Sequence, residues 1–307
     1  MTDALSQYSV LSLYSAMAIY AIAFVLFTLD LAKGAADDGA QAPVGEARAV
    51  STTPANRKLA RIAMALTTLG FFLQLVATVM RGVAASRVPW ANMYEFAMTG
   101  TGIIVAVFLL VNLKWDLRFI GAFITGMVLL LLGLAATRYY VEIVPLPPAL
   151  QSYWLVIHVF VATLATGFFA LGFALSLSQL LQAKREASVA AGTKTRLAFM
   201  TRLPDSIQLE NFAYRLIIIG FVLWTFTLIA GAIWAEKAWG RYWGWDTKEV
   251  WTFIIWTIYA GYIHARSTRG WRGARSAWLA MVGFAAVIFN FTVVNIFFKG
   301  LHAYSGL

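Results

Sequence analysis

The feature of this sequence that most limits its fold is a run of eight apolar stretches, each 15 to 29 residues long. An α-helix rises about 1.5 Å per residue, so about 20 apolar residues cross a bilayer core about 30 Å thick. Tryptophans directly before the shortest stretch allow that helix to begin earlier, at the membrane interface. The sequence therefore predicts an all-α polytopic membrane helix bundle of about eight transmembrane helices. The predicted helices cover residues 8–31, 62–80, 93–113, 119–137, 154–182, 212–235, 250–264 and 277–298.

The composition supports the same fold class. Of the 307 residues, 61% are hydrophobic and 12% are charged, whereas a soluble domain has roughly 25% charged residues. No P-loop glycine pattern or internal repeat divides the chain. Residues 1–307 are therefore predicted to form a single integral membrane domain surrounded by membrane lipid.

Basic residues are distributed unevenly among the connections between these helices. Alternate connections hold 16 Lys and Arg residues in one set and 7 in the other. Because basic loops stay in the cytoplasm, the richer set is predicted to be cytoplasmic, including loops 32–60 and 183–211, with both termini outside. The formal charge of +10 thus follows mainly from topology, and no nucleic-acid partner is expected.

Two absences restrict the chemistry. The chain contains no cysteine, which excludes disulfides, thiolate metal sites and thiol nucleophiles. Any thiol chemistry must therefore use a sulfur atom of another molecule. None of the 14 acidic residues lies in the middle of a predicted helix, which argues against an ion-coupled or proton-coupled transporter.

The most informative segment is the predicted external loop 236–250, which is rich in tryptophan. One or two tryptophans at this level would be ordinary membrane-interface anchors. Five tryptophans lie within residues 239–256, in the loop and at the start of the next helix, interleaved with glycines and charges. They instead predict a surface for a large flat apolar ligand, with Arg241 and Lys248 available for its anionic groups. If the segment were helical, Trp239, Tyr242 and Trp243 would form one aromatic face. The five tryptophans are Trp239, Trp243, Trp245, Trp251 and Trp256.

Two of the three histidines lie on the same side of the membrane as this loop. His158 is at the outer start of the fifth predicted helix, and His302 follows the eighth. Two imidazoles beside an aromatic surface meet the requirements of a bis-histidine haem site. Each histidine alone would more often be a hydrogen-bonded interfacial residue, but the coincidence of both with the tryptophan loop favours the haem site.

The third histidine, His264, is predicted to lie about 20 Å along the seventh helix, toward the cytoplasmic side. It is either a functional intramembrane residue or an interfacial neighbour of Arg266. No second histidine of this chain lies at that depth. An axial haem ligand opposite His264 would therefore come from another subunit.

Two acidic residues, Asp246 and Glu249, lie three positions apart beside the tryptophans. They are candidates for an acid/base pair. The interpretation we favour is that Asp246 orients the loop through backbone contacts or through Arg241.

The tryptophan segment and several other stretches of the chain resemble a known family. The segment Trp239–Trp251 is similar to the signature WGxxWxWDxxE of the haem-handling proteins of cytochrome c maturation. The whole chain resembles the CcsA family, also called ResC, whose members belong to a two-component cytochrome c synthase. The related CcmC proteins are shorter and have about six helices, and the related CcmF proteins are about twice as long as this chain. One departure is Thr247, where many relatives have proline. The resemblance rests on Pro89–Glu95, His158, the tryptophan loop, Tyr262–Arg266 and Gly300–His302.

The resemblance implies a haem-handling subunit of a holocytochrome c synthase of the haem lyase type. It implies that His158 and His302 are axial ligands of the iron of haem b. It also implies that the porphyrin contacts the loop, and that His264 receives haem inside the membrane opposite a histidine of a CcsB/ResB-like subunit. The loop residues implied in haem binding are Trp239, Trp243, Trp245, Asp246 and Trp251.

The implied reaction joins haem vinyl groups to the two thiols of an apocytochrome c CxxCH motif. The implied location is the bacterial plasma membrane in preference to the thylakoid membrane, with the site on the outer, periplasmic face. A haem transporter without attachment activity is the alternative, and an assembly scaffold whose tryptophans are only anchors is a third reading.

Overall fold

The computed structural model describes residues 2–40, 57–144, 150–193, 197–268, 270–298 and 300–302. All regular secondary structure within these residues is helical, and they contain no strand. Three short helices, η1 (Arg118–Ile120), η3 (Ala198–Arg202) and α9 (Val293–Phe297), accompany eight long ones. The long helices are α1 (Thr2–Ala40), α2 (Lys58–Ala85), α3 (Met93–Asn112), α4 (Gly121–Arg138), α5 (Tyr153–Ala190), α6 (Ser206–Trp239), α7 (Thr247–Ser267) and α8 (Ala274–Phe291).

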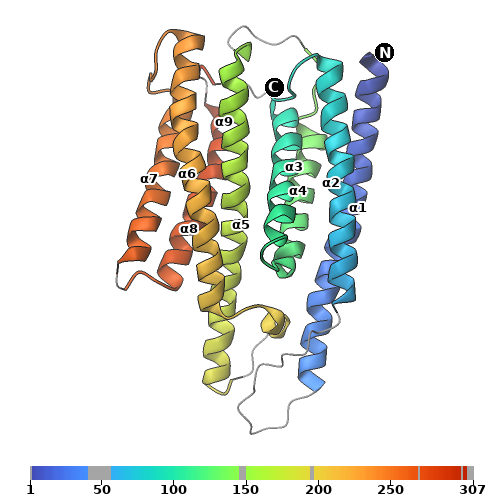
Figure 1. Cartoon of the computed structure of the whole chain (residues 1–307), viewed down its shortest axis with the longest axis vertical. Helices are drawn as coiled ribbons and strands as arrows, with labels where there is room; N and C mark the ends of the chain where they lie inside the picture. The colour runs from blue at the N-terminus through green and yellow to red at the C-terminus, as the bar shows by residue number, and fades with distance from the viewer. Residues whose placement is uncertain are drawn as a thin grey trace.

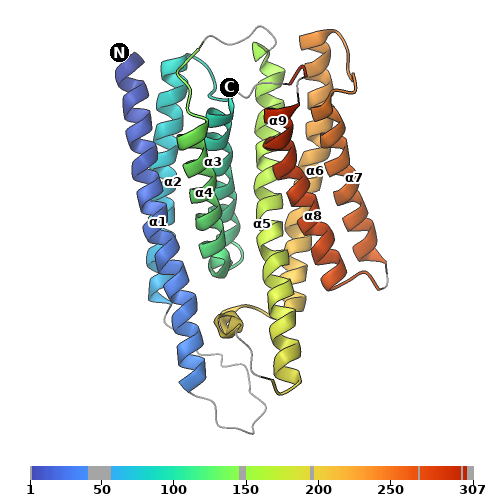
Figure 2. The same ribbon diagram turned by 180° about the vertical axis from the view of Figure 1, so that it is seen from behind.

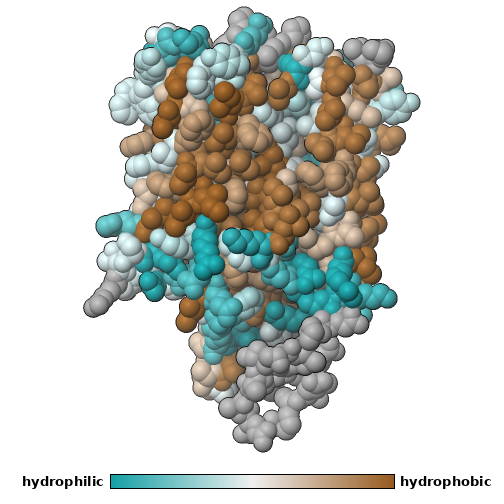
Figure 3. All heavy atoms as spheres, viewed as in Figure 1, coloured by the Kyte–Doolittle hydropathy of each residue, from teal (hydrophilic) through white to brown (hydrophobic). Residues whose placement is uncertain are grey.

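Seven of the described helices are long and apolar enough to cross a membrane, and α7 is not among them because it carries more polar residues. Figure 3 shows the corresponding apolar band across one face of the molecule, with a belt of hydrophilic residues below it. The predicted all-α polytopic membrane bundle is therefore confirmed.

Consecutive long helices run in opposite directions along the bundle (Figures 1 and 2). The most extensive contacts are between α1 and α2, between α5 and α6, and between α7 and α8, while α3 joins the two sides through α4 and α5. Small buried residues lie at these contacts, which lets the helix backbones approach closely as in other membrane bundles. They include Ala16, Ala63 and Ala77 between α1 and α2, and Ala170, Ala174 and Ala213 between α5 and α6.

Buried ion pairs hold the ends of the bundle. At the end near the tryptophan loop, Glu95 is completely buried and pairs with Arg81 at 3.0 Å and with Arg87 at 2.6 Å. At the opposite end, Arg266 pairs with Glu210 at 3.3 Å. Removing one partner would leave a buried charge uncompensated, so these contacts fix the positions of the helix ends.

Several helices extend past their apolar stretches, and the predicted loop boundaries were wrong for this reason. Helix α1 continues to Ala40, α5 continues to Ala190 and α6 begins at Ser206, so the predicted loops 32–60 and 183–211 are shorter than expected. Asp205 caps α6, and Glu186 accepts hydrogen bonds from Ser206. Hydropathy does not register such capping, because it measures only the apolar part of a helix. Residues 41–56 lie outside the described residues.

The start of α1, the start of α5, the α6–α7 connection and α9 all lie at one end of the bundle (Figures 1 and 2). Helix parity predicts this grouping. We call this end the histidine end, because it carries both His158 and His302.

Candidate functional site

His158 lies in the second turn of α5 and faces α6. Its Nδ1 is 3.0 Å from the backbone carbonyl oxygen of Thr227. A carbonyl oxygen only accepts hydrogen bonds, so Nδ1 carries the proton and Nε2 keeps its lone pair. Gly231 makes room for the ring, because a Cβ atom there would come within 2.7 Å of His158 Cε1. The backbone of α6 thus fixes both the position and the tautomer of this imidazole.

His302 is held in the same way by a carboxylate. Its Nδ1 is 3.0 Å from Asp246 Oδ1, and Asp246 Oδ2 accepts the backbone N–H of Leu301 at 2.9 Å. The hydrogen bond from His302 is the main reason why the pKa of Asp246 is lowered to about 2. Gly300 is needed here, because a Cβ atom would collide with the Asp246 carboxylate. Asp246 therefore orients His302 through Nδ1, so that Nε2 is the nitrogen with the lone pair when the imidazole is neutral.

Trp234 contacts both histidines and is 2% exposed. Its ring stacks against His158 with a centroid distance of 5.9 Å and meets His302 edge-on at 5.3 Å. Trp239 contacts the other side of His302 at 4.7 Å. The two imidazoles therefore share one aromatic wall, contributed by the last turns of α6.

A large apolar cavity opens beside this wall. It encloses about 1470 Å³ of empty space, counting its opening to solvent, and lies between α3 and α4 on one side and α5, α6 and α8 on the other. His158, Trp234 and His302 line it near the histidine end, while Ile104, Thr166 and Phe284 line its deeper part. A smaller pocket that also contacts both histidines lies beneath Tyr242 and Trp243. An apolar chamber with two imidazoles suits a flat metalloporphyrin.

The tryptophan loop is organised by Glu249 more than by Asp246. Helix α6 ends at Trp239, and Gly240 takes a left-handed conformation with φ 70°. Glu249 Oε2 accepts the backbone N–H groups of Gly244 and Asp246 at 2.8 and 3.1 Å, and Arg241 pairs with Oε1 at 3.3 Å. Together with Asp246 at the N-cap, Glu249 forms a capping box at the start of α7.

This arrangement corrects three expectations. Only residues 240–246 of the predicted loop 236–250 are outside a helix, because the capping box extends α7 back to Thr247. The aromatic face that Trp239, Tyr242 and Trp243 would form in a helix is absent, because residues 240–246 are not helical. Arg241 pairs with Glu249, so it is not the partner of Asp246. Thr247 occupies the first helical position, where proline is also favoured, so the departure from the family signature leaves the helix start intact.

The predicted tryptophans have different environments. Trp239 lies beside His302, and Trp243 lines the smaller pocket. Trp245 is 78% exposed, takes a left-handed conformation with φ 60° and meets Trp243 edge-on at 5.8 Å. Trp251 packs on Phe289 of α8 at 4.3 Å, away from the histidines. The structure therefore brings Trp239 and Trp243 to the site and leaves Trp245 and Trp251 outside it.

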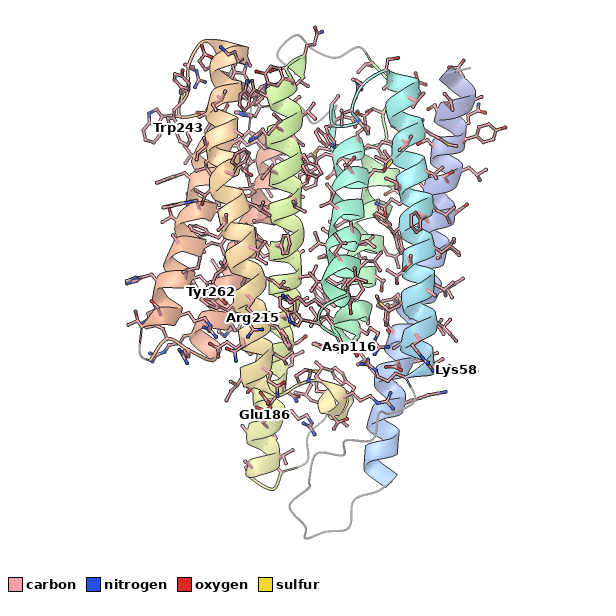
Figure 4. The ribbon with its side chains drawn as sticks, viewed as in Figure 1. Lys58, Asp116, Glu186, Arg215, Trp243 and Tyr262 are labelled. Atoms are coloured by element: carbon pink, nitrogen blue, oxygen red, sulfur yellow. The ribbon has the colours of Figure 1, made fainter. Side chains whose placement is uncertain are left out.

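His264 lies in the last turn of α7, at the opposite end of that helix from the loop. Figure 4 shows Trp243 near the upper end of the molecule and Tyr262, two residues before His264, near the lower end of α7. The His264 side chain is exposed, whereas Tyr262 and Arg266 on either side of it are buried. It therefore faces outward from the bundle and takes no part in the cavity.

Sequence reasoning missed several residues of the site. Trp234 lies five residues before the tryptophan cluster, and its place in an apolar stretch concealed it. Asn295, Asn92 and Trp90 also line the cavity, but their positions near α9 and before α3 become evident only when those elements are assembled. Asn92 could have been recognised from the sequence as a helix N-cap, because asparagine is favoured at that position. In the structure its side chain accepts the backbone N–H of Glu95 at 2.9 Å.

Comparison with known sequences identifies the family. Residues 90–302, which run from Trp90 to His302 and include the whole cavity wall, match the family described as Cytochrome C assembly protein. The chain belongs to this family. It is therefore an integral membrane protein with a role in cytochrome c maturation.

Individual members of the cytochrome c assembly family are about one-third identical to this chain. "Cytochrome c biogenesis protein CcsA" of Prochlorococcus marinus is 34% identical over 270 residues, which are 81% of this chain and 84% of that protein. The proteins of the same name from Guillardia theta and Trieres chinensis are 35% and 33% identical over 242 and 252 residues. These alignments cover 74% of this chain in both cases and 80% and 81% of the relatives.

A solved structure shares the fold. "Cytochrome c Heme Lyase CcmF" superposes with a TM-score of 0.63 at 17% sequence identity. The superposition covers 94% of this chain and 46% of that larger chain. At this identity the likeness concerns the fold of the helix bundle.

Proposed function

We propose that this protein is the haem-handling subunit of a cytochrome c synthase, which holds haem b between His158 and His302 for attachment to apocytochrome c. The observation that carries the proposal is the shared arrangement of the two histidines. Each Nδ1 atom is engaged by a fixed acceptor, Thr227 O or Asp246 Oδ1, so each Nε2 is the nitrogen available to iron. Both rings face one apolar cavity.

The chemistry requires positioning more than proton transfer. A thiol adds across a haem vinyl group, so that sulfur bonds to one carbon while the thiol proton passes to the other, with no net oxidation. The sulfur atoms belong to the apocytochrome, in agreement with the absence of cysteine from this chain. Holding haem rigidly beside a docked CxxCH peptide removes much of the entropic barrier to this addition.

The exposed loop is the proposed docking surface for the apocytochrome. Tyr242, Trp243 and Trp245 all project at the histidine end and are exposed. A left-handed tryptophan is strained, and such strain persists where surrounding contacts enforce it, often at functional sites. Glu249 supplies those contacts at Gly244 and Asp246.

His264 supports a second part of the proposal, in which haem enters through the membrane. It is exposed on the outside of α7, so a ligand opposite it must be supplied by another molecule. We assign that role to a CcsB/ResB-like membrane subunit. The histidine end then faces the outer, periplasmic side of a bacterial plasma membrane, as the excess of basic residues at the other end favours.

The test is the optical spectrum of the full chain purified with its partner subunit, for the wild type and for His158→Ala, His302→Ala and His264→Ala. We expect six-coordinate low-spin haem in the wild type. The two external variants should lose axial ligation, and added imidazole should restore it. Absence of haem from all four proteins, or spectra that no histidine affects, would refute the proposal.

Attachment separates a synthase from a haem transporter. In cells that express an apocytochrome, His302→Ala should stop haem attachment while haem still reaches the complex. Undiminished attachment in both external variants, with haem delivery intact, would leave transport as the function of the chain.

A further inference from the structure

The charge distribution of the cavity is unusual for a chamber of its size. Among its described lining residues there is no carboxylate, and Lys248 is the one lysine or arginine. The remaining lining is mainly aliphatic and aromatic. A ligand that complements this cavity has a large apolar body and an anionic group at one place.

The ammonium group of Lys248 has no direct ion-pair partner in the part of the chain that the structure describes. Its ammonium group donates a hydrogen bond to Asn295 Oδ1, which is neutral, and no ion pair to Lys248 is formed by the described residues. The adjacent carboxylate of Asp246 is engaged by His302, by Leu301 N and by the backbone N–H of Lys248 itself. A cation at the edge of an apolar chamber without a direct ion pair is costly, and an anionic ligand in contact with it would lower that cost.

Two further hydrogen-bond donors at the same cavity lack partners. Asn92 is 4% exposed, and its Oδ1 atom caps α3, but its Nδ2 atom has no hydrogen-bond partner. The Nε1 atom of Trp90 is also buried without a partner. Buried donors are normally satisfied, so two orphans in one cavity wall point to an acceptor that belongs to the ligand.

These donors lie at the same level of the cavity. Phe96 of α3 stacks on Phe291 of α8 with a centroid distance of 4.7 Å. Asn92 precedes Phe96 by one helical turn, and Asn295 follows Phe291 by one turn and donates to its carbonyl oxygen. Both amides therefore lie one turn beyond the phenylalanine pair, toward the histidine end, and Lys248 joins them through Asn295.

We infer that Lys248, supported by Asn295 and joined by the free amide of Asn92, forms a carboxylate subsite that binds a propionate of haem in this cavity. The inference rests on the proposed function and adds to it the edge of the porphyrin that the protein recognises. Histidines alone would accept the ring in several rotations. A charge-assisted contact on one edge fixes the rotation, and with it the position of the vinyl groups.

The experiment compares haem b with its dimethyl ester, which keeps the ring, the iron and the vinyl groups but has no carboxylate. Both are titrated into the full chain purified with its partner subunit, and binding is followed by the Soret band. We expect the wild type to bind the free acid about tenfold more tightly than the ester, as for one charge-assisted hydrogen bond. Lys248→Met should abolish this preference, and Lys248→Arg should keep most of it.

Two further variants test position and charge. Asn92→Asp keeps the helix cap but places a negative charge at the subsite, so it should weaken binding of the free acid and leave the ester unaffected. Lys237→Met removes an exposed basic residue near the end of α6 and is the matched control, for which the preference should stay as in the wild type.

The outcomes separate the two proposals. Equal binding of acid and ester by the wild type, with a six-coordinate spectrum that depends on the histidines, would overturn the subsite and leave the proposed function standing. A wild type without histidine-dependent ligation would overturn the proposed function itself. A third outcome is that oleate binding depends on Lys248 whereas haem binding does not. This result would assign the subsite to a lipid carboxylate and overturn the inference.

Discussion

The pair His158 and His302, on the one hand, and His264, on the other, are the same kind of residue in opposite surroundings. His158 and His302 lie in a cavity, each with a hydrogen-bond acceptor on Nδ1 and each in contact with Trp234. His264 lies on the outer surface of α7 and faces away from the bundle. One chain therefore assembles the surroundings of the first two histidines by itself, whereas the proposed role of His264 requires a second chain.

The largest expected effect concerns whether a partner covers His264. Because the chain has no cysteine, His264→Cys introduces a single thiol that reacts with a maleimide. We expect the partner subunit to slow labelling at this position at least tenfold, a change of about 1.4 kcal/mol or more in accessibility. The measurement is the labelling rate with and without the partner.

The matched control for this labelling is Leu113→Cys. Leu113 directly follows α3 at the same end of the bundle and is strongly exposed. Its labelling should not change when the partner binds. Equal protection of both positions, or of neither, would contradict an interface at His264.

The next prediction tests whether haem affinity depends on the close packing of His158 against α6. In Gly231→Ala the added Cβ atom would lie 2.7 Å from His158 Cε1, so the ring must move. We expect haem affinity to fall about tenfold, or about 1.4 kcal/mol. Gly261→Ala on α7 is the control, because nothing lies within 4 Å of its Cβ position. If both variants bind haem equally well, the packing of His158 on α6 is not needed.

A smaller effect comes from Asp246 and depends on pH. The pKa of its carboxyl group falls from 3.8 to about 2 in the folded protein, chiefly through the hydrogen bond from His302. A lowered pKa means that the stabilisation is complete above pH 3.8 and is lost as the pH falls through 2. Because solvent screens this loop, we expect about 1 kcal/mol.

The measurement is the unfolding midpoint of the wild type and of Asp246→Asn in detergent, from pH 5 to pH 2. The wild type should be more stable at pH 5, and the two curves should converge near pH 2. A constant difference across this range would mean that the carboxylate charge does not hold His302.

The smallest expected effect is at Trp245. Its left-handed backbone, with φ 60°, costs of the order of 1 kcal/mol for a residue with a side chain. Trp245→Gly should therefore raise stability by up to about 1 kcal/mol. Haem affinity should stay within about twofold of the wild type, because Trp245 does not line the cavity. A large loss of haem affinity would place the Trp245 ring at the porphyrin and contradict its assignment outside the site.

Much of the fold was predictable from the sequence, because apolar length is a direct requirement of the bilayer. The helices at 93–112 and 121–138 fall within a few residues of the expected stretches 93–113 and 119–137. Helix parity also placed His158 and His302 at one end. The boundaries of α5, α6 and α7 were less predictable, since caps such as Asp205 and Asp246 extend helices beyond their apolar parts.

The membrane class, the common end of the two site histidines and the family signature around Trp239 all follow from local patterns in the chain. The capping box of Asp246 and Glu249 is local too, because the hydrogen-bond partners of Glu249 lie three to eight residues away. The hydrogen bond between His302 and Asp246 and the packing of Trp251 on α8 became evident only in the assembled bundle. Hydropathy and helix period act between neighbours in the chain, whereas His302 and Asp246 are 56 residues apart and meet only when the helices pack.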